Sequence, residues 1–260
     1  MKPKVVILCG GKGTRMEEET EFRPKPLVEV GGRPILWHIM KIYAHYGFDD
    51  FILCLGYKGR LIKEYFLNYE MMNSDFTLNL GSNHIKIYNK SGEKHWKITF
   101  ADTGEFAQTG ARVKRIEKYI DEDLFMVTYG DGLSNINIRQ LLRFHKSHGK
   151  IGTISGVHPS SRFGELVVKG NDVVEFGEKP QVKEGFVNGG FFVFHRKFFN
   201  YLKDDDNCFM EKEPLENLTK DKQLEAYLHT GFWQCMDTRR ERDILNKLWD
   251  SRKAPWKVWK

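Results

Sequence analysis

The first half of the chain alternates short apolar runs with segments whose apolar residues recur at helical spacing. The apolar runs at 5–8, 51–55 and 124–128 each stop at or shortly before a glycine, a pattern typical of buried strands. Strand, turn and helix in repetition indicate an α/β fold with a mostly parallel sheet. The helices predicted after these strands cover 35–43, 61–68 and 138–148.

The rest of the chain is less regular. A Gly-Asn turn at 170–171 favours local antiparallel pairing of the segments beside it. From Glu211 onward the sequence is expected to be mostly helical and polar. We therefore predict one domain over 1–260, with a core at about 1–240 and a C-terminal helical tail at about 241–260. The further strands predicted are 97–102, 152–157, 166–169, 173–176 and 186–195.

Composition excludes several classes of protein. Hydrophobic residues make up 40% of the 260 positions and charged residues 29%, which is ordinary for a globular protein. No apolar run approaches the ~20 residues of a membrane span, and the apolar stretch at the start is too short for a signal peptide. We expect no membrane association. The four cysteines form no CxxC pair, so we expect reduced thiols in a cytoplasmic protein, without a zinc site or disulfide framework.

The net charge alone does not distinguish between two classes of ligand. A formal net charge of +6 suits phosphorylated small molecules and nucleic acid alike. The chain has no long stripe of lysine and arginine and no recognisable nucleic-acid-binding module. We therefore expect no nucleic-acid partner.

A glycine-rich loop at 10–15 directly follows the first predicted strand. Glycines allow backbone N–H groups to approach an anion closely, and Arg15 can bind a phosphate with two parallel hydrogen bonds. Lys12 adds a second positive charge. The loop lacks the spacing of a Walker A motif, and Met16 stands where a dinucleotide-binding loop needs a small residue. The alternative is a glycine-rich turn without a ligand.

Lys25 lies between Pro24 and Pro26. Each proline fixes its own φ and restrains the residue before it, so this lysine sits on a stiffened segment. A cation fixed near a phosphate-binding loop suits a reaction on a nucleoside triphosphate. The alternative is an exposed Pro-Lys-Pro turn that carries no chemistry.

These stretches together resemble the sugar-phosphate nucleotidyltransferase family. The resemblance implies a Rossmann-like, GT-A-like fold: a mixed, mostly parallel sheet flanked by helices, with a small appended sugar-binding and C-terminal region. The stretches that carry it are GGKGTR at 10–15, RPKPLV at 23–28, GGRPIL at 31–36, YGDG at 129–132, GEKP at 177–180, NGGF at 188–191 and WQCMDT at 233–238.

Within the family, the chain is most similar to members that convert CTP and glucose 1-phosphate to CDP-glucose and pyrophosphate. Such members supply CDP-sugars for bacterial O-antigen polysaccharide. The resemblance also implies a homo-oligomer, for which a hexamer is one expectation. Three alternatives stay open: a relative that uses dTTP or UTP, one that uses another sugar 1-phosphate, and a non-catalytic relative that only binds nucleotide-sugars.

The resemblance assigns catalytic roles to Lys25, Arg15 and Asp131, and implies a Mg²⁺ ion held by Asp131 and Asp237. From the sequence alone, Asp131 also reads as a turn residue before glycine, and Asp237 as a helix N-cap. Arg112 also reads as a surface charge on a helix. The residues expected to bind nucleotide are Leu8, Cys9, Gly10, Gly11, Lys12, Gly13, Thr14, Arg15, Lys25, Thr109, Gly110 and Arg112.

The sugar phosphate is expected at a second group of residues: Gly130, Glu178, Lys179, Asn188 and Gly189. The resemblance implies that the glutamate binds sugar hydroxyls and the lysine binds the phosphate. The asparagine would hydrogen-bond the sugar, and the glycine beside it would leave room for the ring. Without the resemblance, the Glu-Lys pair reads as an exposed acid–base pair and Asn-Gly reads as a turn.

Overall fold

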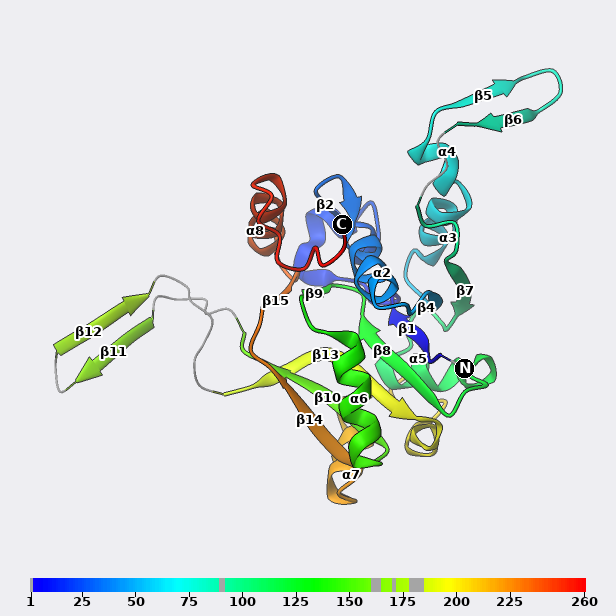
Figure 1. The fold of residues 1–260 in the computed structure, drawn as a ribbon. Helices are drawn as coiled ribbons and strands as arrows, with labels where there is room; N and C mark the ends of the chain where they lie inside the picture. The colour runs from blue at the N-terminus through cyan, green and yellow to red at the C-terminus, as the bar shows by residue number, and fades with distance from the viewer. Residues whose placement is uncertain (1, 89–91, 160–164, 170–171, 178–184) are drawn as a thin grey trace.

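The computed structural model describes residues 2–88, 92–159, 165–169, 172–177 and 185–260 (Figure 1). Its strands are β1 (Lys4–Leu8), β2 (Glu29–Val30), β3 (Arg33–Pro34), β4 (Asp50–Leu55), β5 (Phe76–Asn79), β6 (His84–Ile87), β7 (Lys97–Asp102), β8 (Leu124–Tyr129), β9 (Gly132–Ser134), β10 (Gly152–Val157), β11 (Glu165–Lys169), β12 (Asp172–Gly177), β13 (Val187–His195), β14 (Leu224–His229) and β15 (Trp233–Cys235). Its helices are α1 (Glu17–Thr20), α2 (Ile35–His45), α3 (Gly59–Leu67), α4 (Tyr69–Asn73), α5 (Thr109–Arg115), α6 (Ile138–His148), α7 (Glu213–Lys220) and α8 (Arg239–Asp250), with short 3₁₀ turns at Thr14–Met16, Lys25–Leu27, Glu117–Tyr119 and Arg196–Tyr201.

Seven strands form the central sheet, in the order β14-β10-β13-β8-β1-β4-β7. The pairs β1–β4, β1–β8, β4–β7 and β10–β14 are parallel, while β13 runs antiparallel to both of its neighbours. The predicted mixed, mostly parallel α/β sheet is therefore confirmed. The strands and helices predicted in the first half all form, with ends shifted by a few residues at most.

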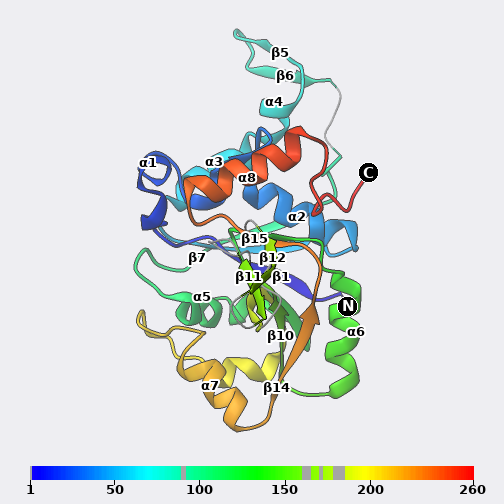
Figure 2. The ribbon, with the colours of Figure 1, turned by 90° about the vertical axis from the view of Figure 1, so that its left-hand side faces the viewer.

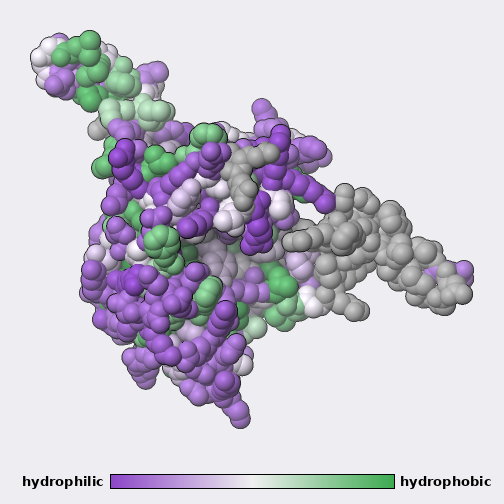
Figure 3. Space-filling model, turned by 180° about the vertical axis from the view of Figure 1, so that it is seen from behind, coloured by the Kyte–Doolittle hydropathy of each residue, from purple (hydrophilic) through white to green (hydrophobic). Residues whose placement is uncertain are grey.

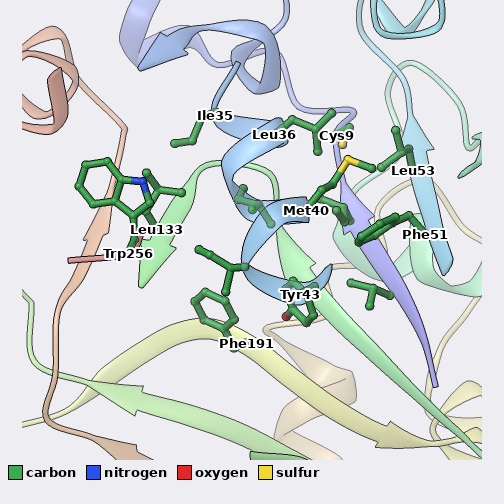
Figure 4. Close-up of a cluster of buried hydrophobic side chains, with 14 of the residues drawn as sticks. Cys9, Ile35, Leu36, Met40, Tyr43, Phe51, Leu53, Leu133, Phe191 and Trp256 are labelled. Carbon is green, nitrogen blue, oxygen red and sulfur yellow. The ribbon is translucent and has the colours of Figure 1, made fainter. Parts of the chain in front are cut away.

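Two apolar layers cover the two faces of the sheet. Along β1, Val5 and Ile7 belong to one buried cluster and Val6 and Leu8 to the other, as the alternation of side chains along a strand requires. Helices α2, α3 and α8 lie on the first side and α5 and α7 on the second (Figure 2). Figure 4 shows how closely α2 packs on the sheet, with Tyr43 facing Phe191.

In the described part of the chain, four two-stranded units accompany the central sheet: β2–β3, β5–β6, β9–β15 and β11–β12. The antiparallel pair β11–β12 confirms the local pairing predicted around the 170–171 turn. The hairpin β5–β6, which was not predicted from the sequence, projects from the body of the molecule (Figure 1). In the part of the chain that the structure describes, no helix has the length and apolar character needed to span a bilayer.

The predicted helical character after Glu211 is wrong for a substantial part of that region. Strand β14 pairs with β10 at the edge of the central sheet, and β15 pairs with β9. An edge strand such as β14, which alternates half-buried and exposed residues, carries only a weak apolar pattern. The helix of the predicted tail ends at Asp250, and beyond it the fully buried Trp256 anchors the chain end.

Candidate active site

A cleft with a cavity volume of about 470 Å³ opens at the carboxyl ends of the central strands. Strands β1 and β8 are parallel neighbours, with Leu8 opposite Tyr129, so the loops that follow them emerge side by side. Open α/β sheets bind ligands at this edge. The predicted site residues that line the cleft are Leu8, Cys9, Gly10, Gly11, Gly13, Thr14, Arg15, Lys25, Thr109, Arg112, Gly130, Asp131, Asn188, Gly189 and Asp237.

Lys25 stands at the centre of a four-residue charge network. Its ammonium is 2.6 Å from Asp131 Oδ2 and also contacts Asp237 Oδ1. The other oxygen of Asp237 is 2.8 Å from the Arg15 guanidinium. The structure therefore brings together all four residues proposed for catalysis and metal binding, although they are spread along the sequence from Arg15 to Asp237.

The environment of Lys25 keeps its side chain charged. Burial alone lowers the pKa of Lys25, but the charges and hydrogen bonds of Asp131 and Asp237 outweigh burial and raise that pKa above its ordinary value. The flanking prolines also help to hold Lys25 in place, because Pro26 is buried in a short 3₁₀ turn that begins at Lys25. This lysine is thus fixed by its backbone and by its partners, and the alternative of an exposed turn is wrong.

Asp237 reaches the cleft because the chain around it is bound on both sides. The Met236 backbone N–H donates to the carbonyl of Asp131 at 2.9 Å, which places the two aspartates beside each other. Thr238 caps helix α8 with a reciprocal capping box to Glu241. The alternative of Asp237 as the helix cap is therefore wrong, and its carboxylate is left to contact Lys25 and Arg15.

The glycine loop takes the conformation that its composition suggests. Gly13 has a φ of +65°, and a Cβ there would lie 2.8 Å from Thr20 Cγ2. A Cβ on Gly10 would lie 2.1 Å from the Arg112 guanidinium, so only glycine fits. Lys12 does not line the cleft; its ammonium lies 4.9 Å from the centre of the Phe106 ring.

Arg112 is buried beneath the glycine loop and is not a surface charge, so that alternative is wrong. Its guanidinium donates to backbone carbonyls at or just after the ends of three neighbouring strands: Gly10 at 3.0 Å, Leu55 at 3.0 Å and Gly104 at 2.7 Å. Arg112 thereby ties together the carboxyl ends of β1, β4 and β7. These hydrogen bonds pair the positively charged guanidinium with oxygen atoms of the protein.

Thr109 and Gly110, the other two residues of helix α5 that were predicted to bind nucleotide, differ in position. Thr109 lines the cleft, but its hydroxyl donates to Glu211 at 2.5 Å. Gly110 does not line the cleft and instead packs against another loop, where a Cβ would lie 2.7 Å from Cys208 Sγ.

Asn188 and Gly189 form the opposite wall of the cleft, on strand β13. The Asn188 amide donates to the Tyr129 hydroxyl at 3.0 Å, and the Gly189 carbonyl accepts from Trp233 Nε1 at 2.8 Å. Gly130 leaves no room for a side chain, because a Cβ there would lie 2.7 Å from the Leu8 carbonyl oxygen. The predicted sugar-phosphate residues Glu178 and Lys179 lie outside the described residues.

Comparison with known proteins agrees with this geometry. Residues 4–245 match the family model for nucleotidyl transferases. The chain belongs to the nucleotidyl transferase family. It is 46% identical over 257 residues to the glucose-1-phosphate cytidylyltransferase of Salmonella typhimurium, covering 98% of this chain and 99% of that protein. It is 47% identical to the probable glucose-1-phosphate cytidylyltransferase of Bacillus subtilis, covering 98% of this chain and 100% of that protein.

Solved structures with lower sequence identity share the fold. A putative glucose-1-phosphate thymidylyltransferase from Bacillus anthracis matches with a TM-score of 0.71 at 19% identity, covering 100% of this chain and 98% of that chain. HddC from Yersinia pseudotuberculosis matches with a TM-score of 0.69 at 23% identity, covering 95% of this chain and 100% of that chain. The protein is an enzyme of the nucleotidyltransferase class.

Nucleotidyl transferases generally use a divalent metal ion. Among the described residues, no three or more His, Cys, Asp or Glu side chains form a metal-binding group. Asp131 and Asp237 nevertheless converge on one cation, the Lys25 ammonium. Two carboxylates fit Mg²⁺, because water and phosphate oxygens usually complete its coordination. The donor set of this nucleotidyl transferase therefore suits an ion that arrives with a phosphorylated substrate.

Tyr129, Glu211 and Trp233 are residues around the cleft that had no role predicted from the sequence, and their side chains form hydrogen bonds there. Tyr129 and Trp233 both line it, and Glu211 lies behind it, bonded to Tyr129 and Thr109. The sequence does contain a feature that points to Tyr129 as a site residue, because Tyr129 ends a buried strand immediately before Gly130. No such feature points to Glu211, because its partners are about 80 and 100 positions away and no local pattern connects them.

Proposed function

We propose that the protein converts CTP and glucose 1-phosphate to CDP-glucose and pyrophosphate. The observation that carries this proposal is the convergence of Arg15, Lys25, Asp131 and Asp237 in one cleft beside the glycine loop. The substrates are those named for relatives that are 46–47% identical over nearly the whole chain. A regulatory relative without turnover is not favoured, because each of these charged groups is present and in contact with another.

In the proposed reaction, a phosphate oxygen of glucose 1-phosphate attacks the α-phosphorus of CTP. The bond from that phosphorus to the bridging oxygen breaks, and pyrophosphate leaves with the electron pair. Both substrates are polyanions, so catalysis consists chiefly of positioning and charge neutralisation. Arg15 and the backbone N–H groups of the glycine loop hold the triphosphate. Lys25 stabilises the negative charge that develops as the bond to pyrophosphate breaks.

Asp131 and Asp237 would hold a Mg²⁺ ion, which when bound supplies positive charge to the phosphate oxygens. Both carboxylates contact Lys25. Phosphate groups entering the cleft give the ammonium a second set of anionic partners, so Lys25 can pass from the aspartates to the substrate. On the other wall, Asn188 and Gly189 would receive the sugar, with Gly130, Glu178 and Lys179 completing that side.

We further propose that the protein acts as a homo-oligomer in the cytoplasm, supplying CDP-glucose for surface polysaccharide. Support for the oligomer comes from hairpin β5–β6, where Leu78 is paired with Ile85 and Phe76 with Ile87. Paired residues lie on one face of a hairpin, so this face is apolar, and Phe76, Leu78 and Ile85 are each more than 40% exposed. Apolar side chains gather on this arm in Figure 3. The four free cysteines support the cytoplasmic location, because disulfides form and persist mainly in oxidising compartments.

The test of the proposed function is pyrophosphate release with a panel of substrates. CTP, dTTP, UTP and GTP are each supplied with glucose 1-phosphate and Mg²⁺, and CTP is then paired with the 1-phosphates of mannose and galactose. We expect the highest kcat/KM for CTP with glucose 1-phosphate. Equal or higher values with dTTP or UTP would contradict the CTP assignment, and no release with any pair would contradict the activity.

A further inference from the structure

A carboxylate just outside the cleft contacts two of the residues that line it. Glu211 lies just before helix α7 and is not among the residues that line the cleft. One of its oxygens accepts a hydrogen bond from the Tyr129 hydroxyl at 2.6 Å, and the other accepts from the Thr109 hydroxyl at 2.5 Å. Tyr129 and Thr109 both line the cleft, so Glu211 contacts the site through them.

The bond to Tyr129 sets the direction of a chain of hydrogen bonds. A carboxylate only accepts, so the Tyr129 proton points to Glu211 and the phenolic oxygen accepts from Asn188 Nδ2 at 3.0 Å. The Asn188 Oδ1 atom accepts from the Gly190 backbone N–H at 2.8 Å, which fixes which way the amide faces. An amide nitrogen carries two N–H groups, and Tyr129 uses one of them. The second can donate to a ligand in the cleft.

Two further features fix the direction in which the hydroxyl groups donate their hydrogen bonds. Burial, together with the negative charge of Glu211, raises the pKa of Tyr129, so its hydroxyl stays protonated and remains a donor. Thr109 in turn accepts from the Met210 backbone N–H at 2.9 Å, so its proton also points to Glu211. Neither hydroxyl can reverse without leaving a partner unpaired.

We propose that Glu211 is a positioning residue for the sugar, acting through Tyr129 to hold Asn188 with an N–H group directed at a sugar hydroxyl. The inference rests on the proposed function, since it assigns the sugar to the wall formed by Asn188. Glu211 touches neither substrate. It makes the donor on Asn188 available before the sugar phosphate arrives.

The experiment compares Glu211→Ala with Glu213→Gln. Glu213 is a matched control, because it is an exposed carboxylate two positions away that pairs with Lys203 on the surface. We expect Glu211→Ala to raise the KM for glucose 1-phosphate about tenfold, the effect of one weakened hydrogen bond. The KM for CTP and kcat should change by less than about threefold, and Glu213→Gln should match the wild type.

Tyr129→Phe removes the link between Glu211 and Asn188 and leaves the contact of Glu211 with Thr109. We expect the same rise in KM, and we expect the double variant to be no worse than either single variant, because both act on one chain of bonds. Fully additive effects would overturn the proposal. A lower kcat, a higher KM for both substrates and a lower thermal stability, all in the same variant, would also overturn it. A merely structural role predicts these changes together.

A binding measurement separates this inference from the proposed function. Calorimetry gives the Kd of CDP-glucose and of CDP for each variant, and neither value needs turnover. Glu211→Ala should weaken CDP-glucose binding about tenfold and leave CDP binding unchanged within about twofold. Equal effects on the two ligands would overturn the role of Glu211. A wild type that binds CDP-glucose but releases no pyrophosphate would contradict the proposed function alone.

Discussion

At the residue scale, the site depends on one ammonium group. Lys25 is buried enough for desolvation to oppose its charge, yet two carboxylates keep it protonated. Such a group is already oriented before substrate binds, which is the condition for effective electrostatic catalysis. Arg112 shows the opposite use of a cation, because its guanidinium is engaged with backbone carbonyls and holds the loops that surround the site.

Replacing Lys25 with alanine should therefore reduce kcat by about 10²–10³, as the loss of one oriented donor typically does. Steady-state pyrophosphate release at saturating CTP measures the effect. Lys118→Ala, at an exposed lysine that does not line the cleft, serves as the control and should keep wild-type kcat. A Lys25→Ala enzyme that retains wild-type kcat would show that this ammonium has no part in the chemistry.

At the element scale, the cleft is built by the ends of elements. The loop after β1 and the turn after β8 meet because their strands are parallel neighbours. Helix α8 contributes through its N-cap, since the capping box at Thr238 fixes the backbone on which Asp237 sits. The β9–β15 pair brings this distant segment to the same edge of the sheet.

Thr238→Ala should lower the free energy of unfolding by about 1 kcal/mol, because it removes the side-chain half of a capping box. Urea unfolding followed by circular dichroism gives this value, and the slope with denaturant should not change. Ser251→Ala at the other end of α8 is the control, since that exposed hydroxyl bonds only to the Leu248 carbonyl in the structure. Equal stability of the two variants would mean that the cap contributes nothing.

Much of this architecture could be predicted at the element scale. Buried parallel strands such as β1, β4 and β8 each contain a continuous apolar run and are followed by a glycine turn, so the sequence marks them clearly. Strand β14 lies at the sheet edge with alternating exposure, and its polar pattern was read as helix. Each strand of the hairpin β5–β6 is only four residues long, so its alternation of apolar and polar residues is at the lower limit of what predicts a strand.

At the scale of the whole molecule, predictability depended on whether a residue lies in a recognisable motif. Arg15, Lys25 and Asp131 lie in motifs, and the structure places them in one cleft. The partners of Glu211 are remote in sequence, so only the fold could connect them. The engagement of Arg112 with three strand ends was hidden for the same reason.

The exposed apolar face of β5–β6 gives a prediction for the assembly. Leu78→Glu places a charge in the middle of that face and should shift the protein to a smaller species in sedimentation velocity, because burying an unpaired charge opposes association. Thr77→Glu on the other face, opposite Lys86, is the matched control and should leave the assembly unchanged. The hairpin plays no part in assembly if both variants sediment like the wild type.

The most direct test of the account is a crystal structure of the protein with a non-hydrolysable CTP analogue, Mg²⁺ and glucose 1-phosphate. We predict the triphosphate on the glycine loop, the α-phosphate beside Lys25, the metal ion on Asp131 and Asp237, and the sugar against Asn188. A complex in which the phosphates bind away from Lys25, or the metal ion contacts neither aspartate, would contradict the account.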